Sequence, residues 1–520
     1  MDTLLHKFGD KIKGVLEGFD RIVFKGSIRN IAYALGMEKF INMHGVLNKD
    51  YRDYVIKQSS VIIDNAEEYA KRLTGSKIQY LASSNIRKET IAHDQQKQLG
   101  IEEGLIGVWS CLESCNTFKA TYEDGAGKPK LLPEKSRCKH LYFYYDHEDY
   151  GFMSIRLQTW APYEIQIALN GREWLKRLLD KSNSGYILEG NKFLDLQDYD
   201  LAQKLLRSQL DTQWVSMLTG FTTQVFPSMP ALLGERMEYY WTQWQSEWAK
   251  DYIFNNPHEL QAQMGYLLRH AFLTGTSDRV LRYMGKPVKD NGQPRFNADY
   301  DLSTQLKLYY DGGRIKHWLY HNSLKLYNEL NVLRFECTIN EPDKFKVFRT
   351  VSGDDSGEKK RLGMRKGIAD INVRAQVSSQ CVKNFTEQIA TLEDDSTVEE
   401  ILSKVSKPVK SDGKRYRALD VTGKDLELLR AIADSKYNVD AITNKHLQVA
   451  LKDTPWAKKL EGKKLSARIG RQLKLLREHG LIKKLPNQHR YMLTAKGRLL
   501  TTSLNQFLGA KLSDLSKLSA

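Results

Sequence analysis

The 520-residue chain has few cysteines and no long apolar segment. Five cysteines are too few for a disulfide scaffold in a chain of this length, and they favour a reducing compartment. The sequence contains no run of 18 apolar residues, which argues against a membrane-spanning helix. The N-terminus, MDTLLHKFGDKIKG, lacks the uninterrupted apolar stretch of a secretion signal. We therefore expect a cytoplasmic protein that does not bind a membrane.

The motifs of common enzyme classes are also missing. The sequence has no P-loop, no dinucleotide-binding fingerprint, no HExxH and no protein-kinase set. No catalytic residue can therefore be named from a motif, and enzymatic activity stays an open question. Aromatic residues make up 10% and hydrophobic residues 41% of the chain, values that predict a folded protein rather than a disordered one.

The positive charge of the chain is concentrated at its C-terminal end. Residues 401–520 contain 26 Lys+Arg and 10 Asp+Glu, a net charge of +16, whereas residues 1–400 contain 53 of each. A field of one sign confined to one part of a chain indicates a polyanionic partner. Nucleic acid is the partner that we expect, and an acidic protein or membrane surface is the alternative.

Hydrophobic patterning predicts an α+β protein of several domains. Residues 1–110 alternate strand-like and helical stretches, which predicts an α/β domain with a partly parallel sheet. Residues 111–350 are interpreted as a β-rich and helical central region, followed by a helix and a basic linker (351–417) and a C-terminal domain (418–520). The expected strands cover 21–27, 77–83, 104–111, 140–146, 151–160, 165–171, 304–310, 314–321, 323–328 and 332–340, and the expected helices cover 50–73, 85–99, 173–181 and 369–392.

The stretch 197–283 is expected to be mostly helical. Trp241, Trp244 and Trp248 follow one another at i, i+3 and i+7, which is the spacing of one helix face. Such a stripe either packs in a core or stacks on bases of a single strand. We favour the core.

The C-terminal domain has the pattern of a winged helix. Amphipathic helices are expected at 422–434, from the capping residue Thr443 to about 451, and from the capping residue Ser466 to Gly480. A hairpin follows at 481–485 and 489–493, and Thr494 caps a last helix. In this arrangement the third helix enters the major groove and the hairpin touches the backbone. The residues that we expect to contact nucleic acid are Arg468, Arg471, Gln472, Lys474, Lys483, Lys484, Asn487, His489 and Arg490, together with Lys414 and Arg415 of the linker.

The segment LLREHGLIKKLPNQHRYMLTAKGRLL resembles MarR-type winged-helix proteins of bacteria. The matching positions are Leu476, Gly480, Leu481, Ile482, Tyr491, Leu493, Thr494, Gly497 and Arg498. This resemblance covers about 85 residues, and it implies a recognition helix, a wing and DNA as the ligand. The upstream part, including FDRIVFKGSIRNIAYALGM, resembles a widespread family of bacterial proteins that share this ending, a likeness that implies no particular chemistry. Winged-helix proteins that bind palindromes are usually dimers, so a homodimer is one expected state.

The window NSLKLYNELNVLRFECTIN is similar to a strand pair of rolling-circle replication initiators. That resemblance implies a tyrosine that attacks DNA and a metal ion held by His and carboxylates. The sequence has no His-x-His pair, the nearest being His317-x3-His321. The alternative is that Arg334 and Glu336 form a cross-strand or interface ion pair. The matching residues are Lys325, Tyr327, Asn328, Glu329, Arg334, Glu336 and Ile339.

Three cysteines and one histidine form a candidate zinc set. Cys111 and Cys115 are followed by Cys138 and His140, which alternate on an expected strand and so face one side. Four protein ligands would make a closed, structural zinc site. The alternative is a group of ordinary buried thiols.

These observations leave three functional hypotheses. The first is a bacterial DNA-binding protein connected with gene regulation or a mobile element. The second is a metal-dependent DNA-processing enzyme, such as a replication initiator or a transposase-like nuclease, which would use Mg²⁺. The third is a partner protein of structured RNA, held by shape and phosphate contacts.

Overall fold

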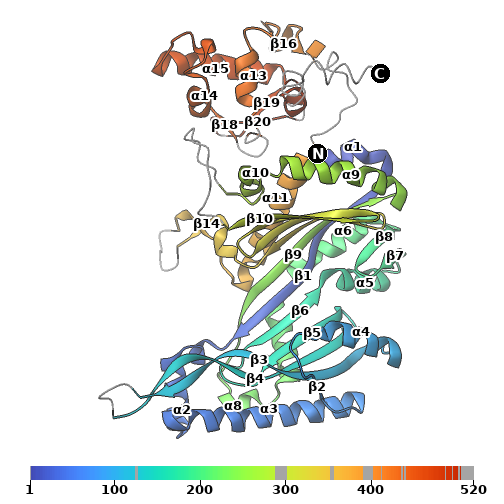
Figure 1. Ribbon diagram of the computed structural model, residues 1–520, viewed down its shortest axis with the longest axis vertical. Coiled ribbons are helices and arrows are strands. Elements are labelled where there is room, and N and C mark those ends of the chain that lie inside the picture. The colour runs from blue at the N-terminus through green and yellow to red at the C-terminus, as the bar shows by residue number, and fades with distance from the viewer. Residues whose placement is uncertain are drawn as a thin grey trace.

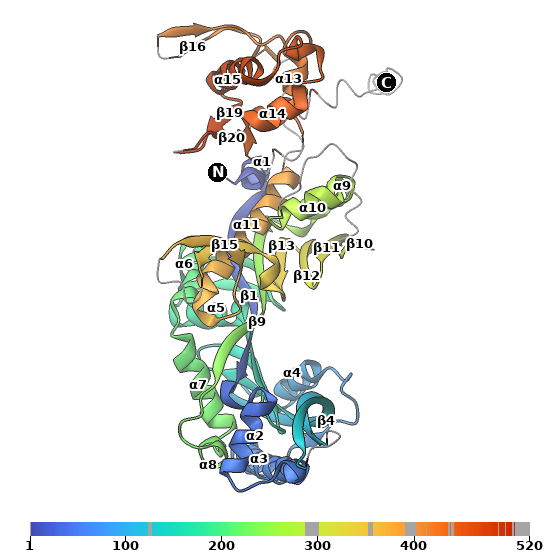
Figure 2. The same cartoon turned by 90° about the vertical axis from the view of Figure 1, so that its left-hand side faces the viewer.

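The fold was analysed in a computed structural model that describes residues 2–122, 127–286, 301–351, 357–390 and, with short gaps, 402–504. The gaps in the last stretch are 404, 412, 435–436, 438–440, 487, 495 and 502–503. A mixed α/β body is built on one large sheet, and a C-terminal region with its own apolar core follows it (Figure 1, Figure 2). None of the helices in these described ranges combines the length and the apolar composition that a membrane span requires.

Two long antiparallel strands lie at the centre of the sheet. Strand β1 (Ile12–Ser27) pairs with β9 (Tyr240–Phe254) over almost its whole length, and Figure 1 shows both running between the α2–α3 end and the α9–α11 end of the body. Aromatic and β-branched residues, which favour a pleated, half-buried surface, are frequent in both. The register shifts between Phe19 and Arg21, so Asp20 is the extra residue of a β-bulge.

The described residues form an eleven-stranded sheet in the order β10-β11-β12-β13-β9-β1-β6-β5-β4-β3-β2. All neighbours are antiparallel except β2 and β3, which are parallel. Besides β1 and β9, the strands of this sheet are β2 (Gln79–Tyr80), β3 (Gly104–Thr121), β4 (Lys130–His147), β5 (Gly151–Gln158), β6 (Ile165–Asn170), β10 (Leu302–Tyr309), β11 (Gly312–Leu319), β12 (Asn322–Glu329) and β13 (Val332–Ile339).

The sheet contains the same topology twice. Strand β1 is followed by helices and by the antiparallel strands β3 to β6, and β6 returns beside β1. Strand β9 is likewise followed by helices and by β10 to β13, and β13 returns beside β9. The β1–β9 pair is therefore the seam between two similar halves, a repetition that the sequence does not reveal.

Helices cover both faces of the body. Helix α3 (Tyr51–Thr74) packs on β3 near one end, and α4 (Lys88–Leu99) lies against β3, β4 and β5 on the opposite face. At the other end, α9 (Pro257–Thr274) packs on β11, and α11 (Ile371–Ala390) packs on β13 and β9. The other helices of the body are α1 (Thr3–Phe8), α2 (Ala34–Met43), α7 (Trp214–Val225), α8 (Met229–Leu233) and α10 (Ser277–Tyr283).

A small layer covers part of the seam on the face opposite α11. It consists of α5 (Gly171–Lys181), β7 (Tyr186–Glu189), β8 (Lys192–Leu196) and α6 (Tyr199–Ser208). Two glycines of β1 allow α6 to approach closely, because a Cβ at Gly18 would lie 2.5 Å from Leu206 and a Cβ at Gly14 would lie 2.3 Å from the Tyr199 ring. This close contact holds the α5–α6 layer over the central strands.

The C-terminal region is a helical cluster with a three-stranded sheet in the order β18-β20-β19. Its core contains Leu429, Leu447, Ile469, Leu476 and Leu493. The elements are α13 (Leu426–Ile432), β18 (Ile442–Thr443), α14 (Asn444–Leu451), α15 (Gly462–Glu478), β19 (Ile482–Lys484) and β20 (Arg490–Leu493). Two hairpins precede it, β14 (Lys346–Thr350) with β15 (Lys359–Gly363) and β16 (Val409–Ser411) with β17 (Lys414–Tyr416).

Several predictions of elements are confirmed. The combination of helices with a partly parallel sheet is observed, although the parallel part is only the β2–β3 pair. The strands expected between 304 and 340 are β10 to β13. Thr443 caps α14, accepting a hydrogen bond from the His446 amide at 3.1 Å, and Gly480 ends α15 with φ of +71°.

Other predictions are wrong. Residues 240–254 form strand β9 rather than a helix, so Trp241, Trp244 and Trp248 do not share a helix face. The predicted boundary at residue 110 falls inside β3, and the strands of residues 1–110 belong to the common sheet. Ser466 lies inside α15, which begins at Gly462, and it hydrogen-bonds Asn444 instead of capping the helix. The segment expected to be a basic linker, just before residue 418, contains the β16–β17 hairpin.

Candidate functional site

A buried ion network occupies the seam of the sheet. Arg334 on β13 lies opposite Asp251 on β9 and donates from Nε to Oδ1 at 2.5 Å and from Nη2 to Oδ2 at 2.7 Å. Its Nη1 donates to Oδ1 of Asp20, the bulge residue of β1, at 2.9 Å. Arg172, at the start of α5, donates to Asp251 Oδ2 at 2.9 Å. All four side chains are buried, so these charges compensate one another.

The pKa values in this network follow from burial and from the paired charges. Burial alone would raise the pKa of Asp251, but Arg334 and Arg172 lower it to about 2. Asp20 and Asp251 raise the pKa of Arg334 against the opposing effect of burial. Asp251 and Arg334 are therefore both charged at neutral pH, and the network fixes β1, β9, β13 and α5 to one another.

Three carboxylates converge next to this network. Asp20, Glu247 and Glu336 each place one oxygen within 4.8 Å of the others. They come from β1, β9 and β13, so the bulge at Asp20 directs its side chain toward the other two strands. Burial and the negative charge of Glu336 raise the pKa of Glu247 to about 7. Oxygen ligands of this kind suit Mg²⁺ or Mn²⁺, and such an ion would relieve the repulsion among the carboxylates.

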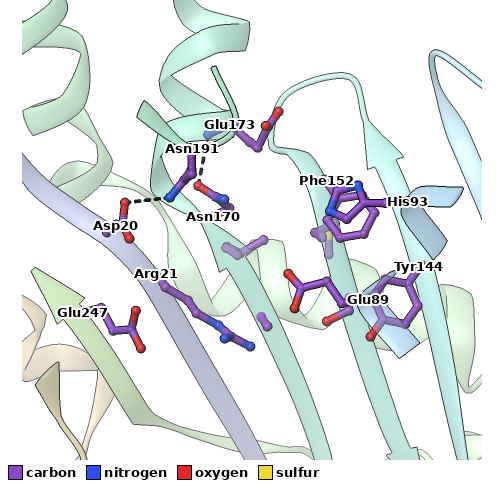
Figure 3. A pocket seen from close by; sticks show the side chains of 15 residues that line it. Asp20, Arg21, Glu89, His93, Tyr144, Phe152, Asn170, Glu173, Asn191 and Glu247 are labelled. Carbon is purple, nitrogen blue, oxygen red and sulfur yellow. Dashed lines mark hydrogen bonds between the residues drawn. The ribbon is translucent and has the colours of Figure 1, made fainter. Parts of the chain in front are cut away.

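A pocket of about 420 Å³ opens beside Asp20 and Glu247. Figure 3 shows Arg21 pointing from β1 across this pocket toward Glu89 of α4, while Asn191 hydrogen-bonds Asp20 at 2.9 Å. The far wall is aromatic, because the rings of His93 and Phe152 stack with their centroids 3.8 Å apart next to Tyr144. Asn170 and Glu173, from the start of α5, complete the labelled lining. The pocket thus combines carboxylates, one arginine and ring surfaces.

A second polar hollow lies on the other side of Glu336. It is lined by Tyr309, Asp311, Arg314, Lys325, Tyr327, Asn328 and Glu329. Tyr327 donates its hydroxyl to Glu336 Oε2 at 3.3 Å, and Lys325 forms an ion pair with the other oxygen of the same carboxylate. Glu336 is therefore shared between the acidic cluster and Lys325 and Tyr327 of this polar hollow.

The residues that resemble a replication-initiator strand pair lie on β12 and β13. The structure does not pair Arg334 with Glu336: Arg334 contacts Asp20 and Asp251, while Lys325 contacts Glu336. His317 is buried on β11 and accepts or donates a hydrogen bond with Thr304 at 2.8 Å, whereas His321 is exposed. The alternative of an ion pair between Arg334 and Glu336 is therefore wrong. Each of the two side chains instead forms an ion pair with a residue on another strand.

The zinc candidates face one side of the β3–β4 hairpin. Cys111 lies opposite His140, and Cys138 Sγ lies 4.0 Å from His140 Nδ1. Cys111 and Cys115 are four residues apart on one strand, which separates their Cα atoms by roughly 13 Å. Glu113 lies between them and accepts hydrogen bonds from Cys111 and Lys88. The four ligands share a face without meeting at one point, and zinc binding stays a prediction.

Helix α15 carries four of the expected nucleic-acid contacts, Arg468, Arg471, Gln472 and Lys474. Arg471 and Lys474 are exposed, and Arg468 is half-buried over the Trp456 ring, with its guanidinium carbon 4.4 Å from the centroid. Gln472 accepts a hydrogen bond from Arg417 at 3.2 Å. Within the part of the chain that the structure describes, Arg468, Arg471 and Lys474 form no ion pair with an acidic residue. Their charges are therefore available to solvent or to an anionic ligand.

The hairpins next to α15 carry the other expected contacts. Lys483 and Lys484 are exposed on β19, Arg490 is exposed on β20, and Gln488 and His489 are exposed in the connecting turn. Asn487 lies outside the described residues. Lys414 and Arg415 are exposed on β17. The structure thus brings the described residues of this set into one region around α15.

Sequence reasoning missed Asp20 and Glu247. Asp20 precedes a strand-like run, and Glu247 lies in the stretch expected to be helical, so neither belonged to a visible motif. Two other acidic residues, Asp146 and Asp149, form ion pairs with Arg177 and Lys181 of α5. The cluster is assembled from three distant strands, so no pattern within one segment of the sequence could locate it.

A scan of protein-family models finds no match to this chain, and searches of curated proteins and of solved structures find no match either.

Proposed function

We propose that this protein binds duplex DNA through its C-terminal region, which acts as a winged helix. The order α13, α14, α15, β19, β20, with β18 pairing to β20, agrees with that arrangement. In it, α15 is the recognition helix and the β19–β20 hairpin is the wing. A role in gene regulation or in a mobile element is consistent with this activity.

The observation that carries the proposal is the cationic face of α15. Leu465, Ile469 and Leu476 fix the opposite face in the core, so Arg471 and Lys474 point away from it. The charge of the chain outside residues 401–520 is balanced, which leaves this region as the source of the net +16. Exposed arginine and lysine on a helix neutralise phosphates and hydrogen-bond guanine edges.

DNA is favoured over duplex RNA because of groove geometry. The major groove of B-DNA admits an α-helix, whereas the major groove of A-form RNA is too deep and narrow for one. A partner protein of structured RNA is the alternative outcome of the test below.

The test is binding of the full chain to a DNA duplex and to an RNA duplex of the same sequence, in a salt series. We expect tighter binding to DNA, with an affinity that falls steeply as salt increases. Nucleic acid that co-purifies with the protein should be digested by DNase rather than by RNase. Equal or tighter binding to RNA, or binding to neither duplex, would contradict the proposal.

A second candidate function is metal-dependent cleavage or transfer of phosphodiester bonds. It is favoured by the convergence of Asp20, Glu247 and Glu336 beside a pocket that contains Arg21. In such a reaction the carboxylates would hold Mg²⁺ or Mn²⁺, which polarises the phosphate, and Arg21 would bind a phosphate oxygen.

This second candidate is tested with supercoiled and single-stranded DNA in the presence of Mg²⁺ or Mn²⁺. We expect nicking by the wild type, loss of nicking in E247Q/E336Q, and full activity in the exposed control E102Q/E103Q. Inertness of the wild type on every substrate, or equal nicking by both variants, would reject it.

A further inference from the structure

The β16–β17 hairpin is fixed beside the candidate recognition helix. Arg417, which follows β17, donates from two nitrogens to the two oxygens of buried Asp425, at 2.6 and 2.7 Å, and also contacts Gln472 of α15. His479, the residue after α15, hydrogen-bonds the Arg417 carbonyl at 2.8 Å. The base of this hairpin is therefore bound both to the start of α13 and to α15.

The hairpin also packs along α15 itself. Lys474 Nζ lies 5.7 Å from the centre of the Tyr416 ring, and Ser411 hydrogen-bonds Glu478. Val409, Ser411, Lys414 and Tyr416 share one face of the hairpin, because Val409 pairs with Tyr416 and Ser411 pairs with Lys414. Tyr416 and Ser411 of this face contact α15, whereas Lys414, beside the turn, is exposed.

The opposite face of the hairpin places like charges side by side. Lys410 and Arg415 are directly opposite each other in the register, and both are exposed. Like charges in this position destabilise a two-stranded pair. Together with exposed Lys414, they make the hairpin strongly basic, which is compatible with an anionic partner that neutralises them.

The second basic hairpin lies on the other flank of α15. Lys483 and Lys484 of β19 and Arg490 of β20 are exposed there. Arg477, near the end of α15, forms an ion pair with Glu478 at 2.7 Å. Figure 2 shows β16 and the β19–β20 hairpin on either side of α15, projecting toward the same side of the C-terminal region.

From this geometry we infer that the two hairpins form a clamp on duplex DNA, with α15 in the major groove and one hairpin on the phosphate backbone at each side. The inference depends on the proposed function and extends it, since a winged helix requires only the β19–β20 wing. Charge complementarity selects the partner. Two basic hairpins flank the cationic face of α15, and a B-DNA groove has a phosphate backbone on each side.

The clamp is tested with the full chain on a DNA duplex, by a salt series and by hydroxyl-radical footprinting. Three double variants each remove one arginine and one lysine: R415A/K414A in the first hairpin, R471A/K474A in α15, and the control R52A/K57A on the exposed side of α3. We expect R415A/K414A to lower the slope of log K against log salt by about two units, since each phosphate contact contributes about 0.9. We also expect it to lose protection on one flank of the footprint only.

The outcomes separate the clamp from the proposed function. If R471A/K474A weakens binding while R415A/K414A behaves like R52A/K57A in slope and in footprint, the clamp is wrong and the winged-helix proposal stands. If the wild type binds no duplex, both are wrong. Loss of protection on both flanks in R415A/K414A would also contradict the clamp, because removal of one side must leave the other in place.

Discussion

Arg334 and Asp251 lie directly opposite each other on β13 and β9 and are joined by two parallel hydrogen bonds in the buried centre of the sheet. Asp20, on the third strand of this group, binds the same guanidinium. This pairing brings three strands that are distant in the sequence to one point. It also positions the Asp20 carboxylate next to Glu247 and Glu336.

Removal of Arg334 should destabilise the protein strongly. R334M leaves two buried carboxylates without their main partner, and loss of one member of such a network costs about 3–5 kcal/mol. Urea denaturation of R334M and of the exposed control R52M measures this difference. An effect of R334M as small as that of R52M would contradict the structural role of the network.

The same network predicts a loss of stability in acid. The folded pKa of Asp251 is about 2, below the ordinary value of 3.8, because Arg334 and Arg172 outweigh the effect of burial. A carboxyl group whose pKa is lowered by folding stabilises the folded state at pH values above its pKa in the unfolded chain. This stabilisation is lost as the pH falls from about 4 toward 2. We expect a loss on the order of 2 kcal/mol in the wild type.

The control for this pH dependence is D251N, which cannot titrate at this position. Its free energy of unfolding should be lower than that of the wild type at pH 7 but should fall less between pH 4 and 2. Parallel curves for the two proteins over this range would show that Asp251 does not carry the effect.

Divalent ions should stabilise the wild type through the acidic cluster. Mn²⁺ that binds only the folded state raises the melting temperature, by mass action. We expect E247Q/E336Q to weaken Mn²⁺ affinity by about tenfold or more, because two anionic oxygen ligands are lost. Thermal unfolding in a Mn²⁺ titration measures this, with E102Q/E103Q as the control; equal shifts in the two variants would exclude the cluster as the binding site.

Metal analysis tests the zinc prediction. If Cys111, Cys115, Cys138 and His140 hold one ion, C111S should lose bound zinc relative to the wild type. The separation of Cys111 and Cys115 along β3 requires a local rearrangement for such binding. Equal zinc content in the two proteins would show that these four residues do not form a zinc site.

Local patterns predicted local structure well. Alternating residues between Asp and Gly turns located β10 to β13, and capping at Thr443 located the start of α14. Strand β9 was missed because Trp241, Trp244 and Trp248 imitate helical spacing. Its actual conformation is set by pairing with β1, more than 200 residues away, and with β13. Such pairing is invisible to a window of a few residues.

The two candidate sites differ in how far the sequence predicted them. The cations of α15 follow one another on a single helix, so helical periodicity was enough to group Arg471 with Lys474. Asp20, Glu247 and Glu336 are brought together by a bulge and by strand order, neither of which has a local signature. The acidic cluster therefore required the fold.

The most direct test of the central claim is the salt dependence of DNA binding by R471A/K474A, compared with the wild type and with R52A/K57A. If the exposed cations of α15 bind phosphates, R471A/K474A should reduce affinity and lower the slope of log K against log salt by about two units, while R52A/K57A leaves both unchanged. An R471A/K474A protein that binds DNA with the affinity and slope of the wild type would contradict the account.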